Sequence, residues 1–183
     1  RVRMFEQAAQ KAGFNRVAEY KGHIAKLIRD YVADGGFIFA MCSAPETMDI
    51  ALSTKAGMVD IVSAELDGTP VENNYHSKLN FQETFCFHNF SLHTSANRYE
   101  FSNIDNPKPD LNALSQVEDF VLFQFAAKHD PIPTMLTQNH VSRVPGYLGQ
   151  TTSFNKSTIR DTVVILGEID GTNYAKYLHG KLG

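Results

Sequence analysis

The sequence of 183 residues contains no long apolar run and no excess of charge of either sign. Its longest apolar runs, Phe37–Met41 and Val163–Leu166, have the length of strands and fall far short of the roughly 20 residues that span a bilayer. The formal net charge is -3 and the pI is near 6.2, so the chain has no general attraction for phosphate backbones or anionic lipid. We therefore expect no transmembrane segment and no nucleic-acid partner.

Cysteine is also scarce. Cys42 and Cys86 are the only two in the chain, so at most one disulfide can form, and their contexts indicate two separate strand positions instead of a disulfide framework. The sequence opens at Arg1 directly in a helical pattern, without an initiator methionine, a leader or a cap, which we interpret as a cut start. These features alone indicate no compartment.

The composition that remains is typical of a folded domain. Hydrophobic residues make up 43% and charged residues 20% of the chain, which supplies apolar side chains for a core without the charge excess of disordered chains. Domains usually run to roughly 100–200 residues. We therefore predict a single domain over residues 1–183, which we expect to be truncated.

Apolar spacing predicts helices in the first part of the chain. Met4–Ala12 has helical spacing and is followed by Gly13 as a stop. His23–Asp34 carries an apolar stripe at positions i, i+3, i+4, i+7 and i+8, and glycine follows again at Gly35.

Strands are predicted between and after these helices. Asn15–Tyr20 is predicted as a short strand, and the continuously apolar Phe37–Met41 as a central strand covered on both faces, as in parallel sheets. Further strands are predicted at Val117–Ala126, Pro133–Leu136 and Asp161–Glu168. This alternation indicates an α/β fold with a mainly parallel sheet and crossover helices, whose sites lie beyond the carboxyl ends of the strands.

The middle of the chain, about residues 60–110, has a different texture. Short β-rich pieces at Thr84–Phe90 and Arg98–Phe101 are separated by turn signals such as Asp-Gly, Asn-Asn and Pro-Lys-Pro. We interpret this range as a β-rich insertion, through which a protein partner could bind.

Cys42 stands where the predicted central strand gives way to a helix. Ser43 and Glu46 have the spacing of a capping box, Pro45 fits the first turn, and the helix is predicted to run to about Ser53. A thiol on such a strand-to-helix turn projects from the sheet, and the helix N-terminus favours both a thiolate and an oxyanion. The alternative is a small buried hydrophobe at the end of a strand.

A catalytic thiol also needs a base, and no histidine is marked by its spacing. His140 and His179 follow predicted strands and are the candidates. Glu46 lies close after Cys42, although the helix dipole alone favours an acidic residue there. Gln150 and Thr151, in a glycine-containing loop, could bind polar groups of a substrate, although a plain connecting turn explains them equally well. No cluster has metal-ligand spacing, so we predict no metal and no cofactor.

The segment from Gly35 to Ala44 resembles the elbow of class I glutamine-amidotransferase-like proteins, including the ThuA-like branch. With Tyr99–Asp105, Asp130–His140 and Gly149–Thr152, the chain is most similar to a bacterial family labelled asparagine synthetase B. The resemblance implies a flavodoxin-like three-layer sandwich in which Cys42 attacks a side-chain amide of a small metabolite. It also implies a location in the periplasm or cell envelope.

The base of such amidotransferases lies in a late His-x-Glu, and no histidine of this sequence is followed two residues later by glutamate. The similar family continues into a Gly-Gly-His-Asp-Pro-Glu stretch, so the resemblance implies a base beyond Gly183. Two hypotheses follow. In the first, Cys42 is a nucleophile, the Ser43 N–H holds the oxyanion, and a histidine is the base. In the second, the domain is a catalytically inactive binding or structural module of the cell envelope.

Overall fold

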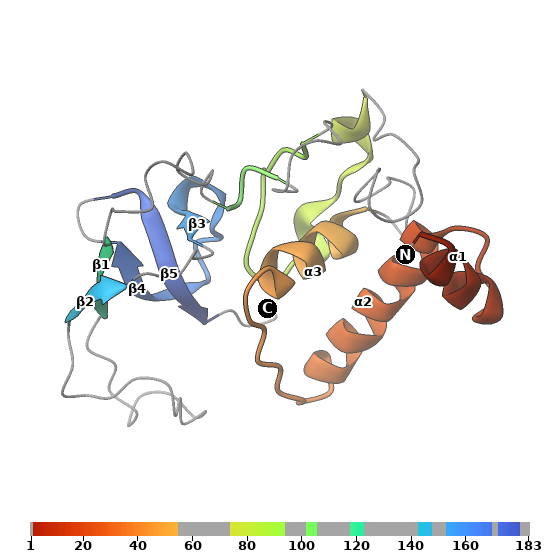
Figure 1. Ribbon diagram of the computed structural model, residues 1–183, viewed down its shortest axis with the longest axis horizontal. Helices are drawn as coiled ribbons and strands as arrows, with labels where there is room; N and C mark the ends of the chain where they lie inside the picture. Colours follow the sequence, from red (N-terminus) through yellow and green to blue (C-terminus); the bar gives the residue numbers. More distant parts are fainter. Residues whose placement is uncertain are drawn as a thin grey trace.

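The computed structural model describes residues 2–54, 74–93, 102–105, 118–122, 143–147, 153–169 and 172–179. Its helices are α1 (Val2–Lys11), α2 (Val17–Ala33) and α3 (Ala44–Ser53). Its strands are β1 (Glu118–Leu122), β2 (Arg143–Tyr147), β3 (Phe154–Asn155), β4 (Val164–Ile169) and β5 (Tyr174–His179). Figure 1 shows the helices at one end of the molecule and the sheet at the other, with residues 74–93 beside α3.

The predicted helices of the first part of the chain are confirmed. α1 is followed by Gly13 at φ 87°, and α2 by Gly35 at φ 95°, the left-handed conformation that glycine adopts without steric cost at a helix end. None of the helices in the described residues is long and apolar enough to cross a membrane. This agrees with the expectation of no transmembrane segment.

The predicted strand at residues 15–20 is wrong, because α2 already begins at Val17. Val17 packs on Ala9 of α1, and Phe5, Phe14 and Tyr20 surround this contact. Burial between two helices has outweighed the local β-propensity of the segment, as tertiary context often does.

The predicted parallel three-layer sandwich is also wrong, because every strand pair in the described sheet is antiparallel. The strand order is β2-β1-β4-β5-β3. β4 confirms the predicted strand near residues 161–168, and β1 lies within the one predicted at residues 117–126. Only residues 170–173 join β4 to β5, whereas a parallel crossover needs a dozen or more residues.

Residues 37–41, the predicted central strand, form neither strand nor helix. Phe37, Phe39 and Met41 are 58%, 51% and 66% exposed. A strand needs a neighbour for its backbone N–H and C=O groups, and within the described residues every strand of the sheet lies at Glu118 or later in the chain. The prediction was therefore wrong about both the conformation and the burial of this segment.

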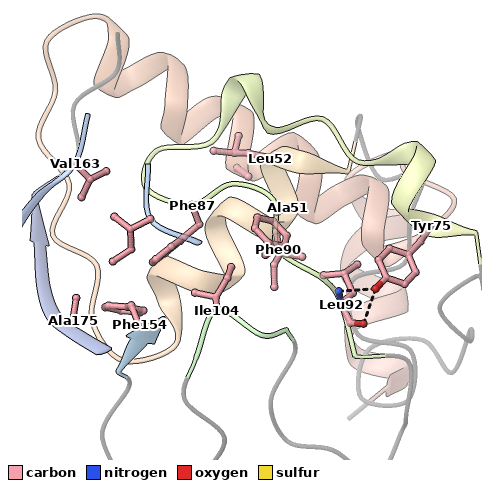
Figure 2. Close-up of a cluster of buried hydrophobic side chains, with 13 residues drawn as sticks. Ala51, Leu52, Tyr75, Phe87, Phe90, Leu92, Ile104, Phe154, Val163 and Ala175 are labelled. Carbon is pink, nitrogen blue, oxygen red and sulfur yellow. Dashed lines mark hydrogen bonds between the residues drawn. The ribbon is translucent and has the colours of Figure 1, made fainter. Parts of the chain in front are cut away.

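The main hydrophobic core joins the two ends of the molecule. Ile50, Ala51 and Leu52 of α3 pack with Phe87, Phe90 and Ile104, and β3 and β5 add Phe154 and Ala175. Figure 2 shows these side chains gathered between α3 and the sheet, with the Tyr75 hydroxyl hydrogen-bonded to both backbone groups of Leu92. The described residues of the predicted insertion thus supply part of this core, through 3₁₀ turns and isolated bridges.

Candidate functional site

Cys42 lies at the turn that leads into α3. Its thiol is free and exposed, and its backbone is left-handed, with φ 64°. The N–H of Ala44 donates to the carbonyl of Met41 at 3.1 Å, which closes the turn around Cys42. The sulfur makes no hydrogen bond with any residue that the structure describes. The turn therefore presents an unengaged thiol at the surface.

The backbone of Cys42 is strained for a residue with a β-carbon. A left-handed conformation costs roughly 1–2 kcal/mol in any residue except glycine, and such residues concentrate at functional sites. In nucleophile elbows the same kind of sharp turn holds the nucleophile at the start of a helix. The turn thus has one feature of an elbow, although no strand precedes it.

Ser43 precedes α3 but does not cap it through its side chain. Instead its carbonyl accepts both the N–H and the hydroxyl of Thr47, each at 3.0 Å. The predicted helix span to Ser53 and the place of Pro45 in the first turn are confirmed, whereas the capping box is wrong. The Ser43 side chain therefore accepts no hydrogen bond from the first backbone N–H groups of α3. These N–H groups place the partial positive charge of the helix N-terminus at the turn.

Glu46, the predicted capping and substrate-binding residue, is directed into the interior. Its side chain is 2% exposed, and the hydroxyl of the buried Ser102 donates to its carboxylate at 2.5 Å. The same hydroxyl accepts the N–H of Ile104 at 3.1 Å. In the structure, Glu46 therefore joins α3 to residues 102–104.

Asp49, one helical turn further along α3, holds a second segment. Its carboxylate accepts the backbone N–H groups of Phe85, Cys86 and Phe87 at 2.7, 2.7 and 2.8 Å. Burial raises the pKa of Asp49 to about 6, against the three N–H donors and the positive charge of Arg160, which lower it. Asp49 lies on the same buried face of α3 as Ile50. Because a buried carboxylate needs hydrogen-bond donors, an acidic residue on this apolar face could have indicated that Asp49 binds another segment.

Cys86, the second thiol, differs from Cys42. It is half-buried, and burial raises its pKa to about 12, with a further contribution from the charge of Asp49. A thiol that holds its proton so firmly is a poor nucleophile, because the thiolate is the reactive form.

Three predicted site residues, His140, Gln150 and Thr151, lie outside the described residues. The described part of the chain contains no group of three or more His, Cys, Asp or Glu side chains that could hold a metal ion. Of the predicted site, the structure therefore describes Cys42 and Ser43 at the surface turn, Glu46 in the core, and the backbone of His179 at the end of β5.

Comparisons with protein-family models, with curated proteins and with solved structures find no match for this chain. The resemblance to amidotransferase-like proteins therefore rests on the sequence segments given above.

Proposed function

We propose that this chain is an enzyme that uses the Cys42 thiol to hydrolyse, or to transfer nitrogen from, an amide of a small polar metabolite. The single observation that carries the proposal is an exposed cysteine with a left-handed backbone at the residue before the α3 turn. Glycine would adopt this φ without strain, so cysteine at this position lowers the stability of the fold while its sulfur is exposed. Ser43 follows directly, where its N–H can serve a developing oxyanion.

The proposed chemistry is acyl transfer. The Cys42 thiolate attacks the amide carbon, and the carbonyl oxygen becomes an oxyanion beside the N–H of Ser43. The C–N bond then breaks, ammonia leaves with the proton that the base took from the thiol, and water hydrolyses the thioester. We propose His140 as the base, with Gln150 and Thr151 binding polar groups of the substrate. Gln150 and Thr151 lie in one of the segments that carry the resemblance, and His140 is proposed because it follows a predicted strand late in the chain.

The test is release of ammonia from glutamine and from asparagine. We expect Cys42→Ala to abolish release, and His140→Ala to lower it by roughly 10²–10⁴-fold, the usual contribution of general base catalysis. Cys86→Ser is the matched control, and it should leave the rate unchanged. Activity that survives in Cys42→Ala would rule the proposal out.

A binding or structural module of the cell envelope is the second candidate. The observation in its favour is the amount of apolar side chain that α2 and residues 37–41 expose, since patches of this size mark interaction surfaces. A protein that releases no ammonia from either amide, yet binds a cell-envelope component through this surface, would favour the module over the enzyme.

A further inference from the structure

Seven large apolar side chains form an exposed surface along α2 and the segment that follows it. We call it the α2/37–41 surface; its members are 37–66% exposed and are Ile24, Leu27, Tyr31, Phe37, Ile38, Phe39 and Met41. The α2 members lie at positions i, i+3 and i+7, on one face of the helix. A β-carbon added to Gly36 would lie 2.4 Å from the Tyr31 ring, so this ring rests on the backbone just before Phe37. The two parts of the surface are therefore continuous.

The surface is large for a monomer. An aromatic side chain offers roughly 200 Å², so Tyr31, Phe37 and Phe39, at 58%, 58% and 51% exposure, leave about 330 Å² in water. The four aliphatic members bring the total to on the order of 600–700 Å². A stable interface needs about 800 Å² from each partner, so this surface supplies most of one half.

Among the residues that the structure describes, the backbone of this segment has no hydrogen-bond partner either. Residues 37–40 make no backbone hydrogen bond with any described residue. Aromatic and β-branched side chains without charge are typical of a strand that pairs with another chain. No Lys, Arg, Asp or Glu occurs from Gly35 to Pro45, so this segment offers no opposite charge to a charged partner.

We propose that the α2/37–41 surface is a two-fold dimer interface with a second copy of this chain. A second copy offers the same neutral apolar side chains and the same free backbone groups, which an isologous interface requires. Antiparallel pairing centred on Phe39 places Phe37 opposite Met41 and Ile38 opposite Ala40, with no like charges facing each other. The pairing ends one residue before Cys42, so it is independent of the proposed thiol chemistry.

The experiment is sedimentation equilibrium of the full chain over a wide concentration range. We expect the wild type to dimerise, and Phe39→Asp to raise the dimer dissociation constant at least about 100-fold, because two carboxylates would face each other at the centre of the interface. Met4→Asp is the matched control: Met4 is 61% exposed on α1, outside the surface, and its variant should dimerise like the wild type. Far-UV circular dichroism checks that both variants fold.

Four results would overturn the proposal: a wild type that is monomeric at every concentration, an open-ended assembly, a Phe39→Asp variant that still dimerises, or equal dissociation of both variants. A monomer whose amides at residues 37–41 resist hydrogen exchange would mean that the chain covers the segment itself. Cys42→Ala should stay dimeric, which separates failure of this proposal from failure of the proposed catalysis.

Discussion

At the scale of single residues, the two thiols of this chain stand in contrasting environments. Cys42 is exposed at a strained turn, whereas the pKa of Cys86 is raised to about 12 by burial and by the charge of Asp49. At pH 8 Cys86 therefore keeps its proton almost entirely, and the thiolate is the species that alkylating agents attack.

We therefore predict that iodoacetamide at pH 8 modifies Cys42 and leaves Cys86 unmodified in the native protein. Intact mass would show one adduct, and peptide mapping would place it on Cys42. The Cys42→Ser variant should take up none until denaturant exposes Cys86. Modification of both thiols at similar rates in the native protein would contradict the prediction.

Asp49 gives a second prediction at this scale, because its pKa differs between the folded and unfolded states. Folded Asp49 holds its proton up to about pH 6, whereas an unfolded aspartate loses it near 3.8. Between these values the folded state binds more protons, so the free energy of unfolding falls as the pH rises. The fall from this group should be on the order of 2 kcal/mol between pH 4 and pH 7.

Asp49→Asn isolates this contribution, because the amide does not titrate. The stability difference between the wild type and the variant, measured by urea denaturation at each pH, should narrow by that amount as the pH rises. Ser77→Ala, at an exposed serine that carries no titrating group, is the control and should show a constant difference. If the difference in the free energy of unfolding between the wild type and Asp49→Asn widens with rising pH, the three N–H donors lower the pKa of Asp49 more than burial raises it.

At the scale of elements, α3 is held by its two buried carboxylates more than by its cap. Glu46 receives the Ser102 hydroxyl and Asp49 receives three backbone N–H groups, while the Ser43 side chain makes no capping bond. Each hydrogen bond joins α3 to a segment distant in sequence. The helix is therefore fixed by tertiary contacts on its buried face.

Ser102→Ala tests this anchoring. The variant removes the donor to Glu46 and the acceptor of the Ile104 N–H, and we expect a loss of about 2 kcal/mol, since the loss of hydrogen bonds by buried polar groups costs about 1–3 kcal/mol. The measurement is urea denaturation monitored by circular dichroism. Ser77→Ala, at an exposed serine with only a local hydrogen bond, should change stability little; an equal loss in both variants would count against the anchoring.

The helices were predictable from the sequence because their signals are local. Glycines at positions 13 and 35 end α1 and α2, and Pro45 marks the first turn of α3, each through the backbone of that residue alone. At the candidate site, the local pattern likewise placed Cys42 immediately before a helix. The side-chain partners of Glu46 and Asp49 lie 36 to 56 positions away in sequence, so no local pattern could identify them.

The sheet was not predictable in the same way. The apolar sequence of residues 37–41 fits both the inside of a parallel sheet and a surface that binds another chain. In either location apolar side chains are removed from water, which is favourable. In the sequence, only the short connection between β4 and β5 indicates that these two strands pair in antiparallel orientation. A strand is parallel or antiparallel only relative to the strand with which it pairs, and the sequence of one strand does not identify that neighbouring strand.

At the scale of the whole molecule, one hydrophobic cluster couples the helical end to the sheet. Phe87 is fully buried against α3, forms an isolated bridge with Ile159, and lies 5.1 Å from Phe154 of β3 between ring centroids. Residues 74–93 thus contact both ends of the molecule (Figure 1). Loss of this contact should weaken both ends together.

We predict that Phe87→Ala lowers the free energy of unfolding by about 3–5 kcal/mol, the usual cost of removing a buried phenylalanine side chain. Because the cluster spans both ends, helix signals in circular dichroism and tyrosine fluorescence should report one coincident urea transition in the wild type and in the variant. Met4→Ala, at a side chain that is 61% exposed, should shift the midpoint little. Two separate transitions, or a shift confined to one probe, would mean that the helical end and the sheet fold as independent units and that Phe87 does not couple them.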